Sequence, residues 1–232
     1  FRGLREKHFT GSASEVTPFG SPRRMAVLVT DVAAKSPDEP FRQKLVPVQV
    51  GLNFDGQATP ALTKKMAALE ISCPVSELSH VTEGKNTYLY YDGVRAGVPL
   101  TEGLQKILEE TVKALPIPKV MNYQLADGVT TVQFVRPVKH LTALYGQSVV
   151  PVTLFGLSAD RVTSGHRFLT QGLIAIDRAD DYEETLFRKG KVIANYERRR
   201  AVLVDLLKKE AAKDGGTLIA PEALIDETNS LT

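Results

Sequence analysis

Residues 164–168 have the strongest chemical character in the chain, because Ser164, His166 and Arg167 set a hydroxyl, an imidazole and a cation around a glycine. This combination is typical of a polar pocket. Hydrolysis would also need an activated nucleophile or water and an orienting carboxylate, for which Asp160 and Asp177 are candidates by proximity in sequence alone. A lone histidine of this kind is more often a hydrogen-bonding strut. We therefore expect no catalytic residue here.

Two arginines directly precede a Val-rich run that predicts a buried strand over residues 25–32. Arg23 and Arg24 would place two guanidinium groups at the entrance of that strand, where they could bind phosphate through paired hydrogen bonds. The alternative is a solvated turn or ion pairs with nearby carboxylates, and the even charge balance of the chain favours it.

Arg136 and His140 follow another predicted strand and are four residues apart. A helical turn there would set the imidazole beside the guanidinium, and such a pair could bind an anion or a carbonyl. The structural alternative is that Pro137 simply ends the strand. Arg136 would then anchor the strand to a carboxylate, and we favour this interpretation.

Two charged runs near the C-terminal end have simpler explanations. Residues 197–200 read Glu-Arg-Arg-Arg at the start of a predicted helix, the end at which the helix dipole disfavours cations, so we expect a solvated face. An interface with RNA or an acidic partner is the minority interpretation. The acidic residues at 180–184 open the preceding helix and stabilise its N-terminus, so they predict no metal site.

The overall composition limits what the chain can do. Its 29 Lys and Arg against 27 Asp and Glu give a net charge of +2, far from the strong field of an autonomous nucleic-acid binder. Any RNA contact must therefore be local. The sequence holds no Gly-rich phosphate loop with a lysine, no HExxH, no GxSxG and no paired-cysteine motif. We expect nucleotide activation to reside elsewhere, and no bound cofactor or metal.

The single cysteine and the hydropathy pattern bear on the compartment. Cys73 has no cysteine to pair with, which fits a reducing cytosol. No apolar run approaches the roughly 20 residues that span a bilayer, so we expect no membrane partner.

Both ends of the sequence look cut, because the chain opens without Met and the helical pattern at 222–231 stops without a cap. These features predict a fragment of a larger cytoplasmic protein.

The hydrophobic pattern predicts a mixture of helices and strands. The clearest helix runs through residues 104–115, with Thr101 as its cap and Pro116 at its end. Further helices are predicted at residues 1–9, 62–69 (capped by Thr59 and Pro60), 180–193, 195–213 and 222–231. Besides 25–32, strands are predicted at residues 46–50, 87–91, 129–135, 149–154 and 173–176, with a loop at 11–21 and an Asp-Gly turn at 53–56.

Together these elements predict an α+β or mixed α/β fold. We expect mainly antiparallel or mixed sheets with flanking helices, and a helical C-terminal part. The predicted division is a sheet-and-helix region at residues 1–178 and a helical region at 179–232 that continues into a longer subunit.

Four stretches together resemble the β subunit of bacterial heterotetrameric glycyl-tRNA synthetase. They are GSPRRMAV at residues 20–27, VQFVRPV at 132–138, TSGHRF at 163–168 and ADDY at 179–182. Their order and spacing also match, and their occurrence together is far more specific than any one of them. The chain is identified on these motifs as an N-terminal fragment of that family's β subunit.

The resemblance implies a part in a ligase that attaches glycine to its tRNA. In that family the α subunit forms the adenylate from glycine and ATP, and the β subunit contributes tRNA binding and assembly of an α2β2 tetramer. The implied partners are the α subunit, a second β subunit and tRNA. The implied RNA contacts, on the residues singled out above, are Arg23, Arg24, Arg136, His140, His166 and Arg167.

Two alternatives remain open at this stage. Part of the family's β subunit is similar to the editing-domain fold of the phenylalanyl-tRNA synthetase β subunit, so residues 1–178 are predicted to be editing-domain-like in part. An aminoacyl-tRNA deacylating domain would use His166 as a general base. Because glycine is the smallest amino acid, a size-based sieve has little to reject, and we do not infer editing. The other alternative is a pure subunit scaffold that never touches RNA.

Overall fold

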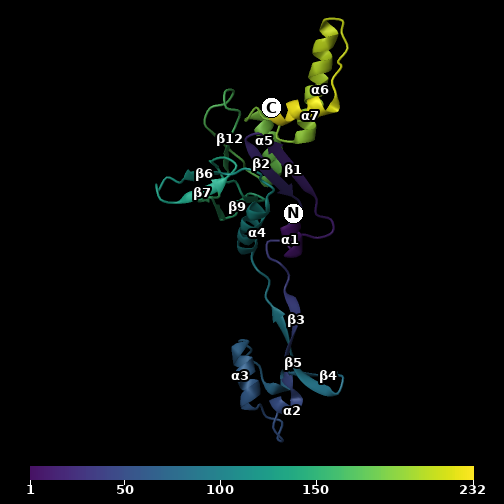
Figure 1. Cartoon of the computed structure of the whole chain (residues 1–232), viewed down its shortest axis with the longest axis vertical. Helices are drawn as coiled ribbons and strands as arrows, with labels where there is room; N and C mark the ends of the chain where they lie inside the picture. Colours follow the sequence, from purple (N-terminus) through teal and green to yellow (C-terminus); the bar gives the residue numbers. More distant parts are fainter. The chain divides into compact units, whose positions relative to one another are not determined.

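The computed structural model describes residues 1–232, which form two compact units (Figure 1). The first unit joins Phe1–Ala34 to Pro99–Thr232, and the second unit is Lys35–Val98. The second unit is therefore inserted into the first along the chain. The boundary predicted near residue 178 lies inside the first unit and stays a prediction about the longer subunit.

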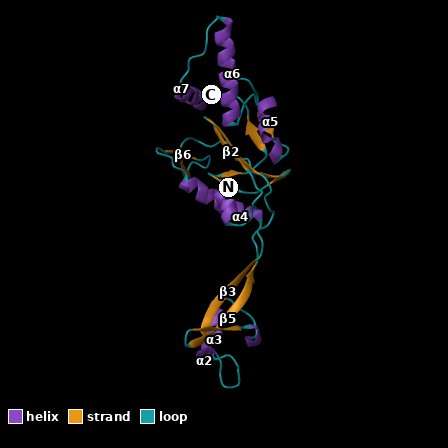
Figure 2. Ribbon diagram, turned by 90° about the vertical axis from the view of Figure 1, so that its right-hand side faces the viewer, coloured by secondary structure: helices purple, strands orange, loops and turns teal.

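Both units contain helices and strands (Figure 2). The first unit contains α1 (Arg2–Glu6), β1 (Val16–Ser21), β2 (Arg24–Val29), α4 (Leu100–Ala114), β6 (Met121–Gln124), β7 (Thr131–Phe134), β8 (Leu144–Tyr145), β9 (Ser148–Val149), β10 (Thr153–Leu154), β11 (Leu157–Ser158), β12 (Val162–Ser164), β13 (Leu173–Ala175), the 3-10 turn η2 (Ala179–Asp181), α5 (Tyr182–Arg188), α6 (Tyr196–Lys213) and α7 (Glu222–Leu231). The second contains β3 (Glu39–Pro47), α2 (Val48–Gly51), α3 (Pro60–Ala68), η1 (Val75–Glu77), β4 (Ser79–Glu83) and β5 (Asn86–Arg95).

All the strand pairs are antiparallel. The first unit holds five two-stranded ribbons, β1-β2, β6-β7, β8-β9, β10-β11 and β12-β13, and the second holds one three-stranded sheet in the order β3-β5-β4. Helices α5, α6 and α7 make the C-terminal part helical. The predicted fold class, α+β with antiparallel sheets and a helical C-terminal part, is confirmed.

In each unit, the two chain segments that meet at the insertion point are joined by hydrogen bonds. In the first unit the Leu100 amide donates to the Ala34 carbonyl at 2.8 Å. In the second unit the Ser36 amide donates to the Val98 carbonyl at 3.0 Å, and the Val98 amide donates back to Ser36 Oγ at 2.9 Å. The two ends of the inserted unit therefore lie side by side, joined by a pair of hydrogen bonds.

The core of the second unit lies between the three-stranded sheet and helix α3. Its buried side chains are Leu45, Leu62, Met66, Leu78 and Leu89. Helix α3 begins as predicted, with Pro60 in its first turn and Thr59 Oγ1 accepting a hydrogen bond from the Leu62 amide at 3.4 Å. The helix thereby places Leu62 and Met66 on the face that meets the sheet.

The strand predicted at residues 46–50 is wrong in position. The strand runs earlier, as β3, and ends at Pro47, since proline has no amide hydrogen with which to continue the ladder. The next residues turn once as helix α2, with Val48 against the core and Val50 half exposed. Of the three alternating valines, Val46 therefore lies at the end of strand β3, and Val48 and Val50 lie in the helical turn α2.

Helix α4 confirms the clearest sequence pattern and corrects its cap. The helix ends before Pro116, and it buries Leu100 and Ile107 against Leu4 and Phe9. Thr101, predicted as the cap, lies inside the helix, because the helix begins at Leu100 directly after Pro99. Neither Pro99 nor another side chain caps the first turn.

A third core forms where the β1-β2 hairpin meets α5. Its inner face buries Phe19 with Leu186 and Ala194, beside Ala26 and Tyr182. Residues 16–21 were predicted as loop because of their Gly, Ser and Pro content. Pairing with β2 along the whole of β1 overrides that local preference.

The three C-terminal helices begin and end at recognisable signals. Helix α5 is shorter than the predicted 180–193, because Gly190 is buried where a side chain would clash with the helix backbone and Lys191 is left-handed at φ 54°. Helix α6 is capped by Asn195, whose Oδ1 accepts from the Arg198 amide at 2.9 Å, and it stops before Gly215 at φ 71°. None of the helices is long and apolar enough to span a bilayer.

Truncating the core of the inserted unit tests whether that unit has its own stability. Leu89 is fully buried, so Leu89→Ala is expected to lower the free energy of unfolding of this unit by about 2–5 kcal/mol through a cavity. Val94→Ala in the same strand is the control, with an expected loss of about 0.5 kcal/mol or less since Val94 is 67% exposed. Hydrogen exchange of the β5 amides in urea measures both, and equal losses would contradict the assigned core.

Candidate functional site

The turn of the β1-β2 hairpin is the centre of the candidate site. Ser21 pairs with Arg24 across the two strands, so Pro22 and Arg23 form the turn, and Ser21 Oγ accepts from the Arg23 amide at 3.4 Å. The Pro22 carbonyl accepts a hydrogen bond from Arg136 Nη1 at 3.1 Å. Arg136 therefore anchors a backbone carbonyl, whereas the sequence had suggested a carboxylate.

Arg24 points into the structure and ties the hairpin to a second loop. Its Nη2 donates to the carbonyl oxygens of Ser164 and of Gly165, the latter at 3.3 Å. Burial lowers the pKa of the Arg24 guanidinium, with Tyr182 nearby acting against that shift. Arg24 Nε is buried without a hydrogen-bond partner. Of the two arginines predicted to bind phosphate together, only Arg23 is left facing solvent.

The same hairpin also meets the start of α5. The rings of Phe19 and Tyr182 are 5.1 Å apart between centroids, and burial raises the pKa of the Tyr182 hydroxyl. The four stretches at 20–27, 132–138, 163–168 and 179–182, far apart in the sequence, thus meet at one hairpin. Their occurrence together has a structural cause.

His166 is a strut at the base of a surface loop. Its Nδ1 accepts hydrogen bonds from the amides of Phe168 and Leu169, both at 3.2 Å. A nitrogen that accepts two N–H groups carries no hydrogen, so the neutral ring has its hydrogen on Nε2. The ring therefore presents a donor to its surroundings, and its basic nitrogen is occupied.

The carboxylates considered for hydrolysis do not join this histidine. Asp160 Oδ1 accepts from the Arg161 amide at 2.6 Å, and Asp177 is exposed. No hydrogen bond or ion pair links either of them to His166. The acid–base geometry that a histidine general base requires is thus not assembled here.

Arg136 and His140 are not brought together by a helical turn. Residues 135–136 form a bend and 137–140 are irregular, so the spacing of four residues does not place the imidazole beside the guanidinium. His140 is exposed. Strand β7 ends at Phe134, so it stops before Pro137 and not at the proline.

Three cations near the hairpin turn have no carboxylate partner. Arg23, Arg136 and Arg167 are exposed, and none of them forms an ion pair. Other exposed arginines do, for example Arg188 with Glu184. We call these three residues the basic surface. Guanidinium groups without a carboxylate partner can bind an anion; Arg136 does so with the N–H groups that it does not give to the Pro22 carbonyl.

The run at residues 197–200 was predicted as a solvated face, and this is wrong for Arg199. Only 9% of Arg199 is exposed. Its Nη1 donates to the carbonyls of Gly20 and Ile193, each at 2.9 Å, while Nε and Nη2 donate to the Asn229 carbonyl at 3.3 and 3.1 Å. Burial lowers the pKa of this guanidinium as well. Arg199 thus joins β1, α6 and α7.

The neighbouring arginines of that run are bound to carboxylates. Arg198 Nη1 lies 3.0 Å from Glu183 Oε1, and Arg200 Nε lies 2.6 Å from Asp226 Oδ1 and also contacts Glu222. These pairs join α6 to α5 and α7. They leave the run without an unpaired cation for RNA.

The acidic residues and the cysteine have structural settings. Glu183 and Glu184 lie in the first turn of α5, as predicted, where acidic groups are stabilising. Cys73 is half-buried in the second unit, and burial raises the pKa of its thiol. No group of three or more His, Cys, Asp or Glu side chains is placed to hold a metal ion.

Removing Arg199 tests its role as a buried link. Arg199→Ala leaves three carbonyl groups without their donor, so the free energy of unfolding of the first unit is expected to fall by about 3 kcal/mol. The adjacent and exposed Arg198→Ala is the matched control, with a loss of about 1 kcal/mol or less. Urea denaturation measures both, and a smaller loss for Arg199→Ala would reverse the assignment.

Comparisons with known proteins place the chain in a family. The family model described as "Glycyl-tRNA synthetase beta subunit" matches residues 2–232. Over 98% of its length the chain is 48% identical to the glycine–tRNA ligase beta subunit of Leptothrix cholodnii and 45% identical to that of Dechloromonas aromatica, covering 32% and 34% of those proteins. It is also 47% identical, over 93% of its length, to that of Thiobacillus denitrificans. The chain thus spans about a third of the length of these relatives. The chain belongs to the glycyl-tRNA synthetase beta subunit family.

Proposed function

We propose that this chain contributes tRNA binding and subunit assembly to a ligase that attaches glycine to its tRNA at the expense of ATP. The single observation that supports tRNA binding most directly is the basic surface, three unpaired guanidinium groups on three segments that hydrogen bonds hold together. Guanidinium groups bind phosphate oxygens through paired hydrogen bonds, and the tRNA backbone is rich in phosphate.

The local nature of the basic surface suits a subunit that shares tRNA with others. The net charge of the whole chain is only +2, so the chain has no broad positive field. Three cations give a small number of phosphate contacts, and such a patch positions RNA without reading its sequence. In this proposal, specificity and most of the affinity come from other parts of the enzyme.

The remaining parts of the proposal concern the complete enzyme. ATP is used through an α subunit, this chain binds no cofactor itself, and two α and two β subunits assemble in the cytoplasm. The relatives' name, a beta subunit of a ligase, supports assembly with another subunit. The outer face of the β1-β2 hairpin supports assembly too, because Met25 is 68% exposed and Val27 is 55% exposed. That face also favours the scaffold alternative, in which the chain contacts only protein.

The deacylation alternative has less support. A general base must present a free lone pair to the water or hydroxyl that it activates. In His166 the Nδ1 lone pair already accepts from the Phe168 and Leu169 amides. The pocket wall that this alternative requires would have to use a different base.

Loss of two cations from the basic surface is expected to weaken tRNA binding in a salt-dependent way. The Arg23→Ala/Arg167→Ala variant should lower tRNA affinity about 10-fold or more at low salt and reduce the slope of log affinity against log salt by about 2. The matched control is Arg2→Ala/Arg188→Ala, which removes the same charge from two exposed, ion-paired arginines. Filter binding across a salt series measures this. Equal losses in both variants would show that the basic surface is not the tRNA contact. No binding at low salt would leave the scaffold alternative.

Mischarged tRNA provides the test for deacylation. Incubated with the chain, it is expected to lose its amino acid at the rate seen in buffer, because His166 has no free basic nitrogen. The measurement is release of labelled amino acid over time. A rate clearly above buffer that drops in His166→Asn would establish the editing alternative instead.

A further inference from the structure

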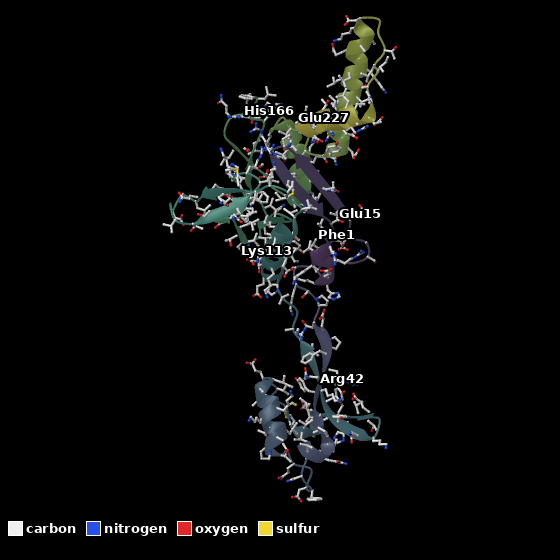
Figure 3. All side chains as sticks on the ribbon, in the orientation of Figure 1. Phe1, Glu15, Arg42, Lys113, His166 and Glu227 are labelled. Carbon is white, nitrogen blue, oxygen red and sulfur yellow. The ribbon has the colours of Figure 1, made fainter.

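The loop that follows β12 is rigidly held although it lies at the surface. We call residues 166–170 the Phe168 loop. Figure 3 labels His166, which comes shortly after the end of β12 at Ser164. The His166 amide donates to the Gly190 carbonyl at 2.7 Å, and the His166 carbonyl accepts from the Thr170 amide at 3.2 Å and from Thr170 Oγ1 at 2.9 Å. With the two bonds to His166 Nδ1, five hydrogen bonds fix the backbone of this loop.

The neighbouring glycine allows the close approach that the loop needs. A Cβ atom at Gly165 would lie 2.9 Å from the Gly190 carbonyl oxygen, tighter than ordinary contacts allow. The Gly165 carbonyl is one of the two that Arg24 binds. The base of the Phe168 loop is therefore fixed from two sides, by α5's end and by the hairpin.

This rigid loop exposes large apolar groups. Phe168 is 81% exposed and Leu169 is 67% exposed, and neither belongs to a core of the first unit. Because the backbone of the loop is already fixed, binding of a partner to the exposed Phe168 side chain costs little further backbone conformational entropy. Such a side chain is suited to contact a flat apolar surface.

The exposed ring is flanked by cationic and planar groups. The Arg167 guanidinium carbon lies 5.5 Å from the centroid of the Phe168 ring, and the His166 ring centroid lies 6.1 Å from it at an interplanar angle of 58°. Arg23 follows Pro22 on the hairpin that Arg24 ties to the base of this loop. The loop thus combines an aromatic face with guanidinium groups that have no carboxylate partner.

We propose that the Phe168 loop binds an unpaired nucleotide, with the base stacked on the Phe168 ring and its phosphate bound by Arg167. This inference rests on the proposed function and deepens it, because it names the kind of RNA element that the basic surface meets. An aromatic face and a cation together match a nucleotide, which pairs a flat base with an anion. Bases inside a duplex are covered by their neighbours, so the loop selects a loop, bulge or single-stranded end of tRNA.

The chain offers a specific optical probe, because it contains no tryptophan. Phe168→Trp places a single indole at the tip of the loop and keeps a ring able to stack. Titration with a short single-stranded RNA is expected to quench its fluorescence, and the same sequence as a perfect duplex is expected to quench it much less. The matched control is Phe54→Trp in the second unit, whose side chain is fully exposed and lies in the Asp-Gly turn. No quenching is expected there.

Two results of this titration would overturn the proposal. Equal quenching of the two tryptophans would show collision with RNA and no binding at the loop. A blue shift of the Phe168→Trp emission that grows with protein concentration and does not respond to RNA would show that a second copy of the chain covers the loop. Either result removes the nucleotide site.

A second variant separates this proposal from tRNA binding itself. Phe168→Leu keeps an apolar side chain and removes the ring, so affinity for single-stranded RNA is expected to fall about 5-fold to 100-fold, the effect of losing one base–aromatic stack. Its salt slope should be unchanged, since no cation is lost. If wild type and Phe168→Leu bind tRNA equally and both respond to salt, the stacking site fails while tRNA binding stands. If neither binds tRNA, the proposed function itself fails.

Discussion

The first unit depends on hydrogen-bond donors for those backbone carbonyl groups that no strand or helix partner satisfies. Much of this unit is irregular, and strands of two or three residues satisfy few of their own peptide groups. Guanidinium groups supply the missing donors. Arg24 serves residues 164 and 165, Arg136 serves the hairpin turn, and Arg161 serves the Gln147 carbonyl at 3.0 Å. Arg199 does the same for three separate segments. One guanidinium can bind several carbonyls at fixed angles, which a lysine cannot.

This use of arginine explains which cations are left for binding. A buried guanidinium that points inward to carbonyls, as in Arg24 and Arg199, is no longer available to a phosphate, and one paired to a carboxylate is largely neutralised. Arg136 is exposed and gives one N–H to the hairpin turn, so its other N–H groups stay available. The hairpin turn holds both kinds side by side, with Arg24 inward and Arg23 outward. The inward arginine fixes the segments that carry the outward ones, so positioning and binding are divided between neighbouring residues.

The sequence predicts the periodic parts of this fold well and the rest poorly, for physical reasons. Helices α3, α4, α6 and α7 have apolar residues at helical spacing, and the fold class follows from them. Strand β1 was read as loop because pairing with β2, a tertiary contact, decides its conformation. The ribbons β8-β9 and β10-β11 are too short to show a period of two.

The contacts that the candidate residues make could not be predicted from the sequence. Sequence reasoning singled out the arginines and His166, yet it could not tell which arginine turns inward, since that depends on segments that lie far away in the chain. It missed Arg199, because four charged residues in a row suggest solvent. A signal was present: Arg199 lies three residues after Tyr196 and four before Leu203, on the half-buried face of α6.

The second unit is an insertion whose two chain ends lie side by side, and we call it the cassette. Because Ser36 and Val98 are joined by hydrogen bonds, and Ala34 and Leu100 are joined on the other side, the polypeptide leaves and re-enters the first unit at nearly one place. A segment attached in this way can lengthen, shrink or disappear without changing the register of the host. Evolution can therefore vary this cassette separately from the hairpin and its arginines.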